Sequence, residues 1–325
     1  MSTQSERKVT GQDVAEEMTY RQAIRAALAD ELRADSHVIL LGEDIAAAGG
    51  SFKTTEGLLD EFGPARVIDT PISENGFVGA ALGMAITGMR PVVEIMFADF
   101  LLSASDAIVN EIAKFRFMSG GQTDTPVTIR AIGGATGRFG TQHSATGESW
   151  YLQIPGLKVV VASSPSAAYG LLRTAIRLND PVIFLEHKGM YTQKEVVDRA
   201  RPLPPVGRAA IVRQGRDVTI VATLLMVPRA LRAAEMLAME GIEAEVIVSA
   251  LDQSAGCRDR RQQCRAHRPS CDCGGTGSRW RLGRYADQSA GAAGVTQKHL
   301  SSCREYARYA YRLQPIAGGC CRTRS

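Results

Sequence analysis

Three side chains with possible chemical roles follow short apolar runs of the chain. Glu74 lies where an apolar run ends, a turn follows and a helix of small residues begins. A carboxyl group there either binds a ligand or only stabilises the first helical turn, by about 0.3–1 kcal/mol. Phe100 lies at the next strand–helix junction, where an aromatic residue is core by default. His143 follows the glycine-rich loop 133–140 and is either a surface residue or a catalyst. That loop lacks the Gly-Lys-Ser/Thr ending of a P-loop, so a nucleotide site there is not favoured.

The cysteines suggest a second kind of chemistry, metal binding. All seven lie after residue 248, at Cys257, Cys264, Cys271, Cys273, Cys303, Cys320 and Cys321. Their spacing contains no C-x2-C pair, although His267 lies nearby, so the zinc-ribbon pattern is absent.

The charge distribution divides the chain near residue 247. Residues 248–325 contain 13 Arg and 1 Lys against 4 Asp and 1 Glu, and they include no Phe or Met. Burying so few apolar groups cannot offset the conformational entropy of ordering the segment, so we predict that it is poorly ordered. The alternatives are a metal-binding tail, an arginine-rich nucleic-acid-binding tail or the product of a reading-frame change near codon 248.

The first 247 residues alternate between predicted strands and helices. Thr19 and Gln22 form a capping-box pattern at the start of the first helix. Apolar runs predict strands at 37–41, 67–69, 91–96, 127–132, 158–162 and 182–186. Helices are predicted at 55–62, 76–87, 100–118 and 166–178. After a proline-rich stretch, a strand at 217–222, a helix at 227–240 and a strand at 243–248 begin a second βαβ unit.

This alternation predicts an α/β fold with a parallel sheet covered by helices on both faces. In such sheets ligands bind outside the carboxyl ends of the strands. We expect a flexible N-terminus at 1–17, a first domain at 18–190, a linker at 191–208, the start of a second domain at 209–247 and an aberrant tail at 248–325. No apolar run is long enough to span a membrane. The polar N-terminus, without a signal core, predicts a cytoplasmic protein.

Several ordered motifs in residues 18–247 give a more specific prediction. They lie at 41–44, 62–67, 69–74, 88–94, 114–116, 142–144, 154–160 and 181–187. In these segments the chain resembles the β subunit of the thiamine-diphosphate-dependent decarboxylating component of 2-oxo acid dehydrogenase complexes. That family includes the pyruvate dehydrogenases and their acetoin dehydrogenase relatives. The resemblance implies a transketolase-like pyrimidine-binding domain followed by a transketolase C-terminal domain, which is truncated or aberrant here.

The resemblance also implies roles for individual residues. Glu74 matches the glutamate that hydrogen-bonds the aminopyrimidine ring of the cofactor, and Phe100 matches the aromatic residue that packs against that ring. His143 matches the active-site histidine near the reacting carbon. A potassium site in some relatives corresponds to five backbone carbonyls, those of Val127, Ala175, Ile176, Leu178 and Asp180.

The family's diphosphate–Mg²⁺ motif is absent from this sequence. The resemblance therefore implies an α subunit that supplies the Mg²⁺ site in an α₂β₂ assembly, and a lipoyl-bearing dihydrolipoyl acyltransferase that accepts the acyl group. The predicted enzyme is an oxidoreductase acting on an oxo group with a lipoyl disulfide acceptor, active only with its α subunit. Acetoin dehydrogenase remains an alternative, as does an inactive scaffold with a metal- or nucleic-acid-binding tail. We expect neither a nucleic-acid nor a membrane partner.

Overall fold

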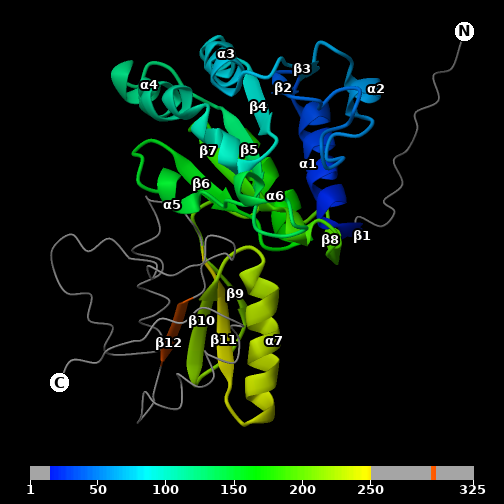
Figure 1. Cartoon of the computed structure of the whole chain (residues 1–325), viewed down its shortest axis with the longest axis vertical. Helices are drawn as coiled ribbons and strands as arrows, with labels where there is room; N and C mark the ends of the chain where they lie inside the picture. Colours follow the sequence, from blue (N-terminus) through cyan, green and yellow to red (C-terminus); the bar gives the residue numbers. More distant parts are fainter. Residues whose placement is uncertain (1–14, 250–293, 298–325) are drawn as a thin grey trace, which may run out of the picture.

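The computed structural model of the chain describes residues 15–249 and 294–297. These residues form a larger unit around a six-stranded sheet and a smaller unit around a four-stranded sheet (Figure 1). Most of the predicted tail at 248–325, including all of its cysteines and His267, lies outside the described residues.

The larger unit alternates strands and helices along the chain. Its strands are β1 (Ala15–Thr19), β2 (Val38–Gly42), β3 (Val67–Asp69), β4 (Arg90–Ile95), β5 (Thr128–Gly133), β6 (Lys158–Val161), β7 (Val182–His187) and β8 (Lys194–Asp198). Its α-helices are α1 (Tyr20–Ala34), α2 (Leu58–Phe62), α3 (Glu74–Ile86), α4 (Ala113–Met118), α5 (Glu148–Tyr151) and α6 (Pro165–Arg177). Short helical turns are η1 (Ala98–Leu102), η2 (Ala107–Ile112), η3 (Thr141–His143) and η4 (Lys188–Met190).

The main sheet is parallel throughout, as the apolar strands predict. Its strand order is β3-β2-β4-β5-β7-β6, and all five pairings are parallel. Every residue of β5 and of β7 is buried, so both faces of the sheet are covered. The order reverses beside β2, because β3 lies on one side of it and β4 on the other. A ligand crevice is expected at such a switch point, at the carboxyl ends of the strands.

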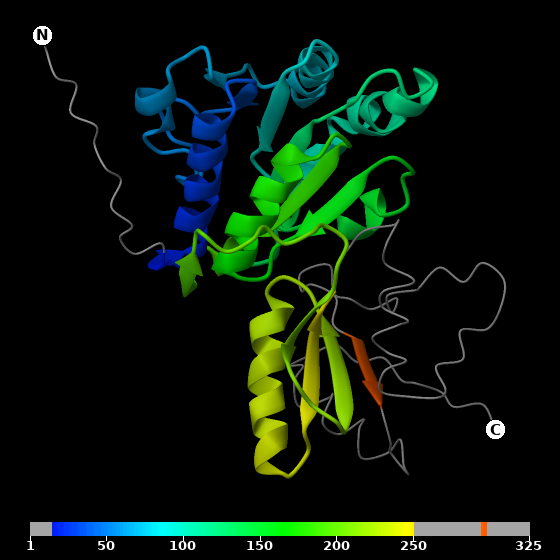
Figure 2. The ribbon, with the colours of Figure 1, turned by 180° about the vertical axis from the view of Figure 1, so that it is seen from behind.

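Two helices hold the larger unit together. The predicted capping box is present: the Thr19 hydroxyl accepts from the Gln22 backbone N–H at 3.2 Å, and the Gln22 side chain accepts from the Thr19 N–H at 2.9 Å. The apolar side of α1 is buried and packs against α6, whose first turn is capped by Ser164 and starts with Pro165. Figure 2 shows α6 lying along the green strands of the sheet.

The structure differs from the predicted elements at three places. The helix predicted at 100–118 is a 3-10 turn (η1), a π-helical turn (η2) and a short α-helix (α4). The Ser105 hydroxyl donates to the Leu102 carbonyl at 2.8 Å, a back-bond that bends helices. The helix predicted at 55–62 begins only at Leu58, because Gly57 has the left-handed φ of 75°. The predicted linker contains β8, which pairs antiparallel with β1.

The smaller unit is a four-stranded sheet with one long helix. Its elements are β9 (Ala210–Arg213), β10 (Val218–Ala222), α7 (Met226–Met239), β11 (Ala244–Val248) and β12 (Gly294–Gln297). The predicted βαβ start is present, since β10 and β11 pair in parallel and α7 packs against both. Two strands were not predicted: β9 and β12 pair antiparallel with β11 and β10. In Figure 1 this unit lies below the larger one, with α7 alongside β11.

Candidate active site

The carboxyl edge of the main sheet gathers the candidate residues. Glu43 directly follows β2, Glu74 follows β3 after a short turn, Phe100 follows β4 within η1, and His143 follows β5 after the glycine-rich loop. Lys188 directly follows β7. The carboxyl ends of parallel strands lie along one edge of a sheet, so residues far apart in sequence converge here.

Glu74 is the first residue of α3 and is half-buried. Its helix start carries no side-chain cap, so its position agrees both with a helix-dipole role and with a ligand role. The neighbouring Asn75 accepts a hydrogen bond from the Ala107 N–H at 3.1 Å, which joins α3 to the segment after η1.

Glu43 is a site residue that the sequence reasoning missed. It is 6% exposed, and its Oε1 has no hydrogen-bond partner among the described residues. Burial raises the pKa of Glu43, and the negative charges of Glu74 and Asp44 raise it further. An acid placed directly after a wholly apolar strand was the available signal. The two acids place two carboxyl groups at this edge, where they can bind a ligand nitrogen.

His143 packs against two phenylalanines. Its ring centroid lies 4.4 Å from that of Phe97, with the planes at 81°, and 5.4 Å from that of Phe100, at 78°. Phe97 and Phe100 themselves meet edge to face at 5.8 Å. The structure therefore brings two of the predicted site residues, Phe100 and His143, into contact. No hydrogen bond or ring contact among the described residues joins either of them to Glu74.

In the loop that bears His143, close packing explains why residue 134 is a glycine. Gly134 has a φ of 88°, and a Cβ there would lie 2.1 Å from Nε2 of His187. His187 is fully buried; its Nδ1 accepts from the Gly189 N–H at 3.1 Å. Burial, then the charges of Lys188 and Arg229, lower the pKa of His187 to about 4. The glycine-rich loop is thus explained by close packing on a neutral imidazole, and no phosphate is needed to explain it.

A buried ion network lies within the strands that form this edge. Arg130 of β5 binds Glu94 of β4 and Glu186 of β7, each at 2.7 Å. The Thr54 hydroxyl also donates to Glu94, and the Tyr191 hydroxyl to Glu186 at 2.7 Å. Burial raises the pKa of Glu94, against the opposing charge of Arg130. The network fixes the relative position of three neighbouring strands.

Four of the five predicted potassium carbonyls accept hydrogen bonds in this structure. Arg90 donates to the carbonyls of Ile176 and Leu178, at 3.2 and 3.0 Å. The carbonyl of Ala175 accepts from the Leu178 N–H, and that of Val127 from the Val182 N–H. A guanidinium therefore lies at two of these carbonyls, and the potassium site stays a prediction.

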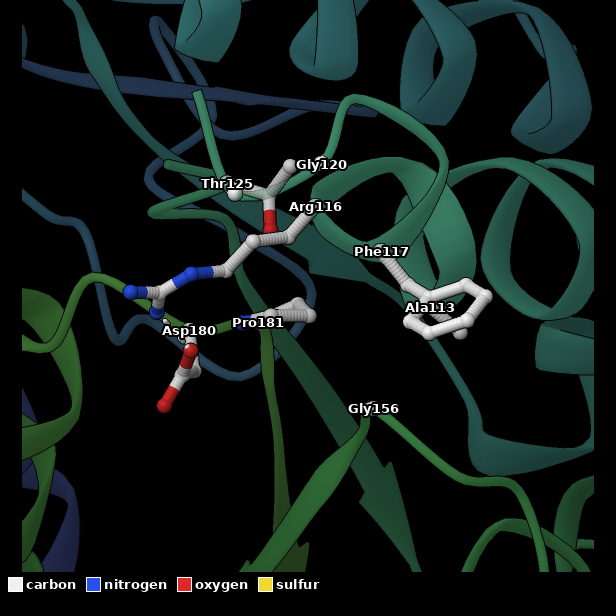
Figure 3. A pocket seen from close by; sticks show the side chains of 9 residues that line it. Ala113, Arg116, Phe117, Gly120, Thr125, Gly156, Asp180 and Pro181 are labelled. Carbon is white, nitrogen blue, oxygen red and sulfur yellow. Dashed lines mark hydrogen bonds and ion pairs between the residues drawn. The ribbon is translucent and has the colours of Figure 1, made fainter. Parts of the chain in front are cut away.

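One hollow of the structure lies away from the carboxyl edge. Its volume is about 530 Å³, and it is lined by Arg116 and Phe117 of α4 together with Thr125, Asp180 and other residues. Figure 3 shows Phe117 and Pro181 on its walls. Thr125 and Asp180 come just before β5 and β7, so this hollow is at the amino ends of the strands, opposite the candidate site. Ligands of open parallel sheets bind at the other edge.

Among the described residues, no three His, Cys, Asp or Glu side chains are grouped so that they could hold a metal ion. Within the same residues, no helix is both long and apolar enough to cross a membrane.

Comparisons with known proteins agree with this architecture. The transketolase pyrimidine-binding domain matches residues 16–194, and the transketolase C-terminal domain matches residues 207–249. A split-gene transketolase, solved as an inactive β4 tetramer, superposes with a TM-score of 0.62 at 25% identity, over 76% of each chain.

Similar sequences identify the family more specifically than the two domain matches do. The chain is 48% identical over 238 residues to the mitochondrial pyruvate dehydrogenase E1 component subunit beta-2 of Oryza sativa, covering 72% of this chain and 63% of the relative. It is also 48% identical over 244 residues to the acetoin:2,6-dichlorophenolindophenol oxidoreductase subunit beta of Cupriavidus necator, covering 72% of each. The chain thus belongs to the family of transketolase-like E1 β subunits. It spans less than two thirds of the length of the rice relative.

Proposed function

We propose that this chain is the β subunit of a thiamine-diphosphate-dependent 2-oxo acid dehydrogenase that decarboxylates pyruvate and passes the acyl group to a lipoyl disulfide. The main support is the acid pair Glu43 and Glu74 at the switch point of the sheet. The contact of His143 with Phe97 and Phe100 at the same edge is the second support.

The residues present suit the pyrimidine half of the cofactor. An aminopyrimidine ring offers a ring nitrogen to a carboxyl group and an apolar face to an aromatic side chain. Glu74 would bind the nitrogen, with Glu43 nearby, and Phe100 would pack against the ring. When bound, thiamine diphosphate supplies the nucleophilic carbon and the electron sink for decarboxylation. His143 would exchange a proton with the reacting group.

The other half of the site is proposed to come from an α subunit. It would hold the diphosphate through Mg²⁺ in an α₂β₂ assembly, and a lipoyl-bearing dihydrolipoyl acyltransferase would receive the product. An exposed apolar residue supports a partner on this side: Ile72, two residues before Glu74, is 85% exposed. Burying such a side chain in an interface is favourable by about 1.5–3 kcal/mol.

Acetoin cleavage on the same scaffold is the second candidate. The observation in its favour is that the Cupriavidus necator relative matches over a larger share of its own length than the rice relative does. The two candidates share the proposed cofactor, so they differ only in the substrate that is consumed.

The test is turnover of the full chain assembled with an α subunit, with pyruvate and acetoin compared as substrates. Glu74→Gln is expected to abolish turnover of both, because an amide cannot donate a proton to the ring nitrogen and take it back. Glu16→Gln, the same chemical change at an exposed position of β1, is the matched control. Normal turnover by Glu74→Gln would refute the site assignment.

A further inference from the structure

Lys188 is a buried lysine whose ammonium group faces the site. It is 7% exposed and begins η4, directly after β7. Its Nζ donates a hydrogen bond to the backbone carbonyl of His143. The same Nζ lies 5.8 Å from the ring centroid of Phe97 and 5.3 Å from that of Phe139. Burial lowers the pKa of Lys188, and only the charge of Asp99 opposes this.

Burying the Lys188 ammonium group costs free energy, because the group gives up its hydration. The His143 carbonyl and the rings of Phe97 and Phe139 offset part of this cost. All three lie around the His143 ring or on the loop that bears it. Cation–π contacts of this kind are strongest where water is excluded.

The ends of the His143 loop are fixed separately from its middle. The Ala145 N–H donates to Asp99 at 3.2 Å, and the Gly134 N–H donates to the Ala145 carbonyl at 2.9 Å. Neither bond involves His143. Its ring is placed by edge contacts with Phe97 and Phe100, and its backbone by Lys188.

We propose that Lys188 is a positioning residue that holds the His143 imidazole against Phe97 and Phe100 at the carboxyl edge of the sheet. Without its ammonium group, the His143 carbonyl loses its donor while both loop ends stay attached. The middle of the loop then gains freedom and the imidazole leaves the aromatic pair. The catalytic consequence rests on the proposed function; the positioning itself does not.

The first experiment is an NMR measurement on the full chain, with histidine and phenylalanine labelled. The His143 ring protons lie in the ring-current fields of Phe97 and Phe100, so their resonances are displaced from those of an exposed histidine. They are assigned by their loss in His143→Gln. In Lys188→Met we expect them to move most of the way to the exposed value, and in Lys188→Arg, which keeps a cationic donor, to move less.

Lys194→Met is the matched control. Lys194 also ends in an ammonium group, but it pairs with Glu17 on the surface, and both side chains are 62% exposed. Its removal should leave the His143 resonances unchanged. Unmoved resonances in a folded Lys188→Met would overturn the proposal. If that variant fails to fold, the proposal is tested on the wild-type protein. The absence of a nuclear Overhauser contact between the Lys188 side chain and the Phe139 ring would then overturn the proposal.

The second experiment is turnover with an α subunit. Lys188→Met should lower kcat by about 10-fold or more with little change in KM, and alter the pH profile, since a displaced acid–base group loses part of its catalytic factor. Unchanged kcat in a variant whose His143 resonances have moved would contradict the proposed role of His143 while supporting positioning. The two ideas therefore fail separately.

Discussion

Glu74 raises the pKa of Glu43 across the switch point of the sheet, acting together with the burial of Glu43. One acid ends the β2 segment and the other begins α3, 31 positions later in the numbering. Because of this interaction and its burial, the ionised form of Glu43 is disfavoured at this edge of the sheet.

Glu43→Gln should stabilise the folded subunit at pH 7. The folded pKa of Glu43 lies above its unfolded value, so ionisation at neutral pH works against folding, and this penalty disappears below the ordinary glutamate pKa of about 4.3. We expect the free energy of unfolding to rise by on the order of 1 kcal/mol at pH 7 and to be unchanged near pH 4. Denaturant unfolding at both pH values measures it; an equal effect at both would contradict the charge explanation.

His143→Gln should lower kcat of the assembled enzyme by roughly 100-fold, the usual contribution of a positioned acid–base group. The free energy of unfolding should change little, because the ring is only half-buried and makes edge contacts alone. Steady-state kinetics and denaturant unfolding of the same preparation separate the two effects. A loss of stability equal to the loss of activity would indicate a structural role.

Arg130→Met should destabilise the larger unit by about 3–5 kcal/mol, because it leaves two buried carboxylates without their cation. Arg33→Met is the control, since Arg33 pairs with Glu61 at a half-exposed surface position and should cost at most about 1 kcal/mol. Thermal and denaturant unfolding give both values. Similar losses for the two variants would mean that the buried network is not what holds the three strands in place.

Gly134→Ala should cost about 1–3 kcal/mol more than Gly140→Ala. Both glycines have a positive φ, 88° and 82°, so alanine strains the backbone at both positions. Only at Gly134 would the new Cβ meet the buried His187 ring, whereas nothing lies within 4 Å of it at Gly140. The difference in unfolding free energy isolates the clash, and equal losses would rule it out.

His187→Gln should remove part of the acid sensitivity of folding. The pKa of His187 is about 4 in the folded chain, below the ordinary value of about 6.5. Stability is therefore full above pH 6.5 and is lost between pH 6.5 and 4, as the unfolded chain binds the proton first. The loss is at most about 3 kcal/mol, by conversion of that shift. Unfolding of wild type and variant at pH 7 and pH 4.5 measures it; parallel pH dependences would disprove it.

The sequence predicted the parallel sheet because its strands are local signals. Residues 182–185, the first four of β7, are all apolar, and such runs are typical of strands buried on both faces. Caps such as Thr19 are likewise local and were placed correctly. The sequence did not predict the turns η1 and η2, because the apolar residues of this segment keep the spacing of an α-helix. The Ser105 hydroxyl bonds to a preceding carbonyl and Asn75 accepts from the Ala107 N–H, and neither bond is visible in a periodic pattern.

By itself, the sequence determined the six strands of the main sheet, that they pair in parallel and therefore that Glu74, Phe100 and His143 follow carboxyl ends of strands. Only the tertiary structure decided which of these side chains meet. The contacts of His143 with Phe97 and of Lys188 with the His143 carbonyl join residues from different strand ends, as does the charge interaction of Glu43 with Glu74. Strand order and loop packing set such distances, and neither is encoded in any local stretch of residues.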